Sequence, residues 1–233
     1  VDSAWLQSPD CAYPVRIDPT IDVSGNSVGL YCVEQGSPNT VIGDNNYPYV
    51  GYDDGITSEN LADYGSAHLI CRTYASIGYD FSQISKEAKI DSATFSVYHY
   101  TSWSKGATNF GLYEVDQSWD RNNLTWNNQT GLSHTFIQYQ RSNTTKGWIN
   151  WDVREVVNSW IQGTSVNNGF VIKAEDERNM QCEVFHNKAH ANKPKLTINW
   201  SVPDPVDVNF PLNSINVALR PITEKDVSGK LIF

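Results

Sequence analysis

The stretch AKIDSATFSVYHYTSW, residues 88–103, decides the fold class of this chain. Ala93, Phe95 and Val97 fall on one side of an extended backbone, because successive residues of a β-strand point to opposite faces. The other side takes a more polar set, namely Thr94, Ser96, Tyr98 and Tyr100. This alternation predicts a long strand with one buried face.

Similar runs, rich in β-branched and aromatic residues, recur between clusters of Gly, Asn, Asp and Ser. With residues 88–103 they make about nine predicted strands. The others fall within residues 45–55, 68–81, 108–119, 133–142, 146–153, 167–176, 181–188 and 194–201. Many short strands separated by turns predict an all-β sandwich or barrel rather than a fold of alternating strands and helices.

Residues 152–163, DVREVVNSWIQG, depart from this pattern. Four apolar residues fall at helical spacing on one face: Val153, Val156, Val157 and Trp160. Asp152 followed by Glu155 is typical of a capping box, and Gly163 is typical of a helix end. The segment predicts one short amphipathic helix whose apolar face packs on the sandwich.

The chain is acidic, and it has enough apolar residues for a packed core. It carries 17 basic and 26 acidic residues, a formal net charge of −9, and 39% of its residues are hydrophobic. Negative charge repels phosphate backbones and anionic lipid. We therefore expect no nucleic-acid partner and no membrane insertion, and we favour a neutral polysaccharide over an acidic one.

The first residues lack the basic and apolar blocks of a signal peptide. Either a signal has been removed or the sequence is a piece of a longer chain, and we favour the second explanation. Four cysteines, Cys11, Cys32, Cys71 and Cys182, lie far apart without a CxxC pair. They permit disulfides in three connectivities, and buried free thiols are the alternative.

Two kinds of metal site deserve comparison. Cys182, His186 and His190 are each four residues apart, a spacing that suits zinc on a helix. This segment is predicted as strand and loop, so zinc is not favoured. A structural calcium ion fits the oxygen-rich segments 43–55 and 116–123 better. The alternative is that their Asp and Asn residues only form turns, which these residue types favour without a metal. The sequence does not identify the calcium ligands.

No motif of catalysis is present. Asp53 with Asp54, and the acidic run 175–177, have no defined separation of the kind that glycoside hydrolysis needs. None of the five histidines accompanies a GxSxG motif, and there is no Gly-rich phosphate loop. We therefore predict that the chain is not an enzyme.

Exposed aromatic rings would suit sugar binding, because the apolar face of a pyranose matches a flat ring. The candidate ligand-binding residues are Tyr98, Tyr100, Trp103 and Trp148. Four other tryptophans are assigned to the core: Trp119, Trp126, Trp151 and Trp160.

Several segments together resemble the DNRLRE domain family, also classed as carbohydrate-binding module family 96. The resemblance rests on RTYASIGYDFSQISKEAKIDSATFSVYHY, DQSWDRNNLTWNNQ, GWINWDVREVVNSWIQGTSVNNGFVIKAEDE and KPKLTINW, in this order across about residues 40–201. It implies a jelly-roll β-sandwich in a secreted bacterial protein. The lead-in WLQSPDCAYPVRIDPTI is similar to segments that precede such domains in Rhs/YD-repeat and wall-associated proteins.

We predict three parts: a lead-in strand and linker (1–28), in which CAYPVRIDPTIDV (11–23) is expected to be extended, the DNRLRE-like jelly-roll domain (29–201), and a Pro-containing connector with a C-terminal strand (202–233). Family members bind alginate through basic residues, whereas this chain is acidic and lacks the literal DNRLRE string. Two functions stay open. One is an extracellular carbohydrate-binding module, and the other is a structural or adhesive spacer of a large cell-surface protein with no glycan ligand.

Overall fold

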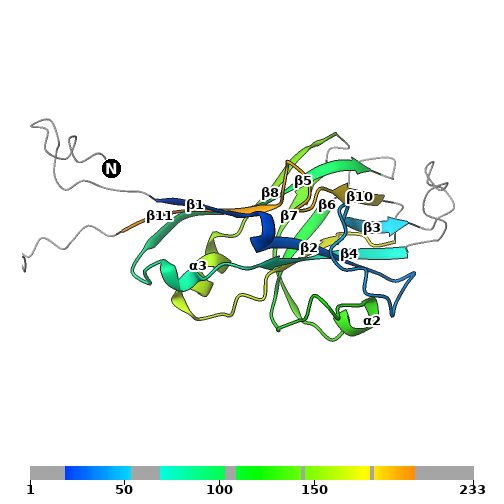
Figure 1. The fold of residues 1–233 in the computed structure, drawn as a ribbon, viewed down its shortest axis with the longest axis horizontal. Helices are drawn as coiled ribbons and strands as arrows, with labels where there is room; N and C mark the ends of the chain where they lie inside the picture. The colour runs from blue at the N-terminus through cyan, green and yellow to red at the C-terminus, as the bar shows by residue number, and fades with distance from the viewer. Residues whose placement is uncertain (1–18, 54–68, 103–108, 143–144, 179–180, 203–233) are drawn as a thin grey trace, which may run out of the picture. The chain divides into compact units, whose positions relative to one another are not determined.

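A computed structural model describes residues 19–53, 69–102, 109–142, 145–178 and 181–202 (Figure 1). These residues form eleven β-strands: β1 Thr20–Ser24, β2 Val28–Glu34, β3 Tyr49–Asp53, β4 Leu69–Ile77, β5 Lys89–Ser102, β6 Asn109–Val115, β7 His134–Arg141, β8 Gly147–Asp152, β9 Phe170–Ala174, β10 Gln181–Phe185 and β11 Lys195–Ser201. Two α-helices, α2 Trp126–Gln129 and α3 Arg154–Gln162, and two short 3-10 turns complete them. The predicted all-β fold class is confirmed.

The strands pair antiparallel in one strongly curled sheet, in the order β1-β11-β5-β10-β3-β4-β9-β6-β7, with β8 added to β5 and β2 added to β4. The curl brings two layers face to face. Phe95 of β5 lies with its ring centroid 5.1 Å from that of Phe170 on β9, across the core. One layer therefore holds β1, β11, β5 and β8, and the other holds β2, β4, β9, β6 and β7. β10 and β3 join the two in the sheet order, as in a jelly-roll sandwich.

Strand β5 runs through the first layer as the alternation predicts. Phe95 and Val97 are fully buried and Ala93 is 1% exposed, while Tyr98 and Tyr100 are only partly buried. Trp151 of β8 is the register partner of Phe95 and is also fully buried. Each such large apolar side chain contributes about 1.5–3 kcal/mol to folding through its burial.

The predicted amphipathic helix is α3, and its capping differs from the prediction. Val157 and Trp160 are buried, and Gly163 ends the helix in the left-handed conformation with φ 74°. Val153 stands at the N-cap, and the Asp152 carboxylate accepts the Arg154 N–H at 2.9 Å. The predicted capping box is wrong, because the Glu155 side chain contacts Arg154 rather than the helix start. A capping box occurs instead in α2, between Thr125 and Asn128.

β1 overlaps the predicted lead-in strand, whereas β2 was missed by the sequence pattern. β1 pairs with β11 from Thr20↔Asn199 to Ser24↔Lys195, so the chain runs into and out of the sheet side by side (Figure 1). β2 pairs with β4, and all seven of its residues are buried. The domain boundary at residue 28 stays a prediction, as do the segments 1–18 and 203–233, which lie outside the described residues.

A second apolar cluster lies on the outer face of the second layer, beneath the loop that joins β6 to β7. Tyr31 of β2 and Tyr74 of β4 belong to this cluster, and Trp119 and Trp126 of the loop pack on it while remaining partly exposed. Of the four tryptophans assigned to the core, Trp151 and Trp160 are buried there. The other two cover this outer cluster.

Three cysteines share a small buried cluster as free thiols: Cys32, Cys71 and Cys182. Cys71 and Cys182 pair in register with Gly51 of β3, one from each neighbouring strand. Burial raises the pKa of Cys32 to about 12 and holds the pKa values of the other two well above their usual range. These thiols stay protonated and pack as small apolar groups. Cys11 lies outside the described residues.

Candidate functional site

Strands β5 and β8 present a row of outward side chains on the open face of the first layer. Tyr98 is the register partner of Trp148, and Ser96 is the partner of Asn150. The Ser96 hydroxyl donates to the Asn150 amide oxygen at 2.7 Å. Further along the same face the Thr197 hydroxyl donates to Asp22 at 2.5 Å, so hydrogen-bonding groups continue across β11 and β1.

A strip of six rings ends this row: Tyr47, Tyr98, Tyr100, Trp148, His186 and His190. We call it the aromatic strip. The His186 ring stacks on Tyr98 and on Tyr100, each with centroids 5.0 Å apart, and on His190 at 4.2 Å. Tyr47 lies 4.6 Å from His190 and 5.3 Å from Tyr100.

A register shift in β10 and the buried side chain of Asn187 bring the residues of the aromatic strip together. The β10–β5 register shifts between Val184 and Phe185, and the His186 N–H then donates to the Tyr98 carbonyl at 3.0 Å. Asn187 is fully buried; its amide N–H groups donate to the carbonyls of Leu30 and Asn45 at 2.9 and 2.7 Å. Its amide oxygen accepts the Leu30 N–H at 3.1 Å. This residue ties together the loops that carry the two histidines and Tyr47.

Two lysines border the strip. The Lys146 ammonium lies 4.4 Å from the centroid of Tyr100, and that of Lys195 lies 5.5 Å from Trp148, both within cation–π range. Burial, followed by the charges of His190 and Lys146, lowers the pKa of His186. His186 is therefore neutral at pH 7, and the strip presents rings with two cations at its edge.

The structure brings together three of the four predicted ligand-binding residues. Trp148 is 42% exposed, and Tyr98 and Tyr100 are partly exposed beside it, whereas Trp103 lies outside the described residues. Sequence reasoning missed Tyr47, which is 37% exposed. It also missed the two histidines as ring partners, because their stacking depends on the long-range β10–β5 pairing.

The zinc hypothesis finds no support in the geometry. Cys182 is buried in the thiol cluster, and His186 and His190 use their faces to stack. No group of three metal-ligating side chains occurs among the described residues. In the segments considered for calcium, Asp44 pairs with Lys188 and the two Asp116 oxygens accept hydroxyls of Ser133 and Thr135. These carboxylates are held by protein groups, and calcium stays a prediction.

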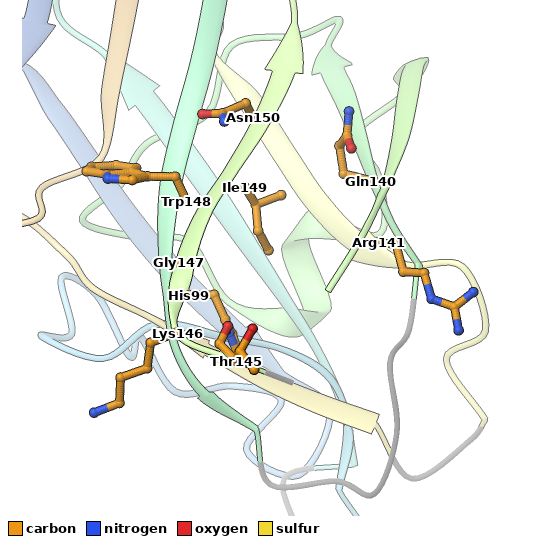
Figure 2. Close-up of a pocket in the computed structure, with 9 residues that line it drawn as sticks. All are labelled: His99, Gln140, Arg141, Thr145, Lys146, Gly147, Trp148, Ile149 and Asn150. Atoms are coloured by element: carbon orange, nitrogen blue, oxygen red, sulfur yellow. The ribbon is translucent and has the colours of Figure 1, made fainter. Parts of the chain in front are cut away.

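A cavity of about 440 Å³ opens beside the strip, between β7 and β8 (Figure 2). Trp148 and Asn150 project from one side of β8 and Ile149 from the other, toward Gln140 and Arg141, and all of them line the cavity (Figure 2). Trp148 thus stands at the boundary between the flat face and this cavity.

His99, Ser102 and Glu183 meet beneath the cavity without forming a catalytic relay. Glu183 lies 2.5 Å from His99 Nε2, and the Ser102 hydroxyl contacts both of them. In a nucleophile–base–acid relay the acid holds the opposite ring nitrogen. Here that nitrogen, Nδ1, lies 2.8 Å from the Thr145 carbonyl, and both His99 and Glu183 are buried. The arrangement is a buried ion pair.

A β-sandwich with partly exposed rings and hydrogen-bonding side chains on one flat sheet face has the architecture of a sugar-binding module. The chain belongs to carbohydrate-binding module family 96, whose sequence model matches residues 57–200. The resemblance found in the motifs is thereby confirmed. No helix of the described residues has the length and apolar character needed to cross a bilayer.

The chain is also similar to two much longer curated proteins, tRNA nuclease WapA of Bacillus subtilis and tRNA3(Ser)-specific nuclease WapA of Bacillus spizizenii. The identity is 25% over 213 residues in both cases, covering 87% of this chain. The chain spans only 8% of the length of these relatives.

Proposed function

We propose that this chain is a non-catalytic extracellular module that binds polysaccharide through the aromatic strip, within a larger bacterial surface or secreted protein. The observation that carries the proposal is the exposed Trp148 ring beside Tyr98 on a sheet face lined with hydroxyls and amides. A pyranose that stacks on these rings finds donors and acceptors at its rim.

The net charge of −9 favours a neutral chain over an acidic one. Lys146 and Lys195 make the edge of the strip locally positive, so an acidic polymer is the necessary comparison. The nuclease names of the relatives describe proteins of which this chain covers 8% of the length. They support a place as one module of a long polypeptide.

The test is a binding screen of the whole chain against neutral glucan, xylan and mannan and against a polyuronate, with calcium and with a chelator. The variant Trp148→Ala should lose binding. Phe136→Ala is the matched control, because this ring is 48% exposed on β7 of the opposite layer. If no polymer binds, the alternative of a spacer without a glycan ligand stands. If Trp148→Ala binds polymer as the parent does, the aromatic strip is not the binding site.

A further inference from the structure

A second cleft lies on the other layer and shares no residue with the aromatic strip. It has a volume of about 520 Å³ and lies between the end of β4, the loop after β6 and the loop before β9. Its lining is Ser76, Ile77, Ser118, Trp119, Asp120, Arg121, Asn167, Asn168 and Gly169. Sites for small ligands in proteins have volumes of roughly 300–1,000 Å³.

Trp119 is the aromatic wall of the cleft, and it is fixed before any ligand arrives. Its indole N–H donates to the Asn168 carbonyl at 2.7 Å. Tyr31 and Tyr74 meet it edge to face, with centroids at 5.7 and 5.4 Å. A ring held in this way loses little side-chain freedom when a ligand stacks on it.

The opposite wall is equally rigid. The Asn167 amide donates to the Ile77 carbonyl at 2.7 Å, and its oxygen accepts the Gly169 N–H at 3.1 Å. Gly169 has φ +75°, and a Cβ there would stand 2.0 Å from the Ala75 carbonyl oxygen. Only glycine fits, which fixes the loop that carries Asn168.

Polar side chains without protein partners surround this wall. The hydroxyls of Ser76 and Ser118 and the amide of Asn168 make no hydrogen bond within the described parts of the chain. The Arg121 guanidinium donates to the Tyr31 hydroxyl at the long distance of 3.5 Å. Asp120 accepts the Asn122 N–H at 2.9 Å on one oxygen and the Asn123 side-chain amide at 2.5 Å on the other, and each oxygen has a further lone pair. One carboxylate and one guanidinium leave the lining without net charge.

We propose that this cleft is a second saccharide site, which takes one neutral hexopyranose ring at the end of a chain. The fixed indole supplies the stacking surface, and the free hydroxyls, the amide and the two opposite charges suit the donors and acceptors of sugar hydroxyls. The two walls of the cleft confine the ligand to one sugar ring, whereas the aromatic strip is flat and can contact several consecutive sugars of a polysaccharide. The choice of a sugar as ligand rests on the proposed function.

The test uses the isotope-labelled whole chain and the methyl glycosides of glucose, galactose and mannose, followed by NMR. At least one glycoside should shift the Trp119 indole N–H and the Asn168 side-chain amide. Loss of hydrogen bonds should make Asn168→Ala and Arg121→Ala bind about five- to tenfold more weakly. Asn168→Ala leaves the Trp119 bond intact because that bond uses the backbone carbonyl. Asn122→Ala is the control in the same loop, since its side chain is exposed and lies outside the lining.

Trp148→Ala should leave these shifts unchanged. The inference is overturned if no glycoside shifts the Trp119 and Asn168 signals, or if the shifts disappear in Trp148→Ala. Polysaccharide binding that persists while the glycosides fail would overturn the cleft alone. Glycoside binding in the cleft without polymer binding would overturn the role of the strip alone.

Discussion

Tyr98 on β5 and Trp148 on β8 are direct register partners, and their rings meet edge to face with centroids 5.5 Å apart at 80°. The pairing turns the Trp148 ring into a supported platform while 42% of its surface stays in solvent. Trp148 is therefore the most exposed ring of the aromatic strip, followed by Tyr47 at 37%.

Replacement of Trp148 should weaken ligand binding and leave the stability of the fold nearly unchanged. We expect Trp148→Ala to weaken polysaccharide binding at least tenfold, about 1.4 kcal/mol, because the stacking surface is lost. The free energy of unfolding should change by less than about 1 kcal/mol, since the ring is outside the core. Titration calorimetry and urea unfolding measure the two quantities. A large loss of stability with intact binding would contradict the assignment.

Asn187 should be important for the shape of the strip rather than for contact with a ligand. Asn187→Leu removes the bonds to Leu30, Asp44 and Asn45 and leaves buried backbone groups without partners. We expect a loss of about 3 kcal/mol in the free energy of unfolding, since each such bond contributes roughly 1 kcal/mol. Near-ultraviolet circular dichroism should show the loss of tyrosine order around Tyr47. The exposed Asn122→Leu is the control for the same change of residue type.

The buried pair of His99 and Glu183 should make the fold weaken at alkaline pH. Burial lowers the pKa of His99, but the bonds to Glu183 and to the Thr145 carbonyl outweigh it, and the net pKa is raised above 6.5. The stabilisation is complete below pH 6.5 and is lost as the pH rises through the raised value. Urea unfolding across this range measures the slope. The double variant His99→Leu/Glu183→Leu should abolish it, and an unchanged slope would exclude the pair as its source.

His134 should behave in the opposite sense. Burial, then the charges of Lys173 and Arg72, lower its pKa to about 4, and its Nδ1 lies 3.1 Å from the Lys173 ammonium. The folded protein resists protonation of this ring, so its contribution to stability is lost as the pH falls from 6.5 to about 4. Lys173→Met should raise the pKa toward 6.5, which an NMR titration of the ring detects. No movement would mean that burial and the Arg72 charge set the pKa without Lys173.

The sequence predicted those parts of the fold that follow local periodicity. The alternation of Ala93, Phe95 and Val97 identified the buried face of β5, and Gly163 marked the end of α3. β2 escaped detection because both of its faces are covered. Leu30 packs in the main core and Tyr31 in the outer cluster, so the strand shows no alternation.

In the candidate site, too, the residues on alternating strands could be predicted from the sequence and the residues in loops could not. Tyr98 and Trp148 were predictable as outward residues of alternating strands. Tyr47 and His190 lie in loops that meet through the buried Asn187, through the contact of His190 Nε2 with the Asn46 carbonyl and through the register shift of β10. No local pattern encodes these long-range contacts. The spacing of residues along the sequence does not predict which residues a long-range strand register brings together.

The antiparallel pairing of β1 with β11 also determines how the sandwich responds to a force applied at both of its ends. Thr20 and Asn199 lie at the same end of this pair, so a force pulling the two flanks apart acts on one hydrogen bond at a time rather than on all of them together. The hydrogen bonds between β1 and β11 therefore break one after another from that end. β1 separates at low force, while the face of β5 and β8 that carries the aromatic strip stays folded.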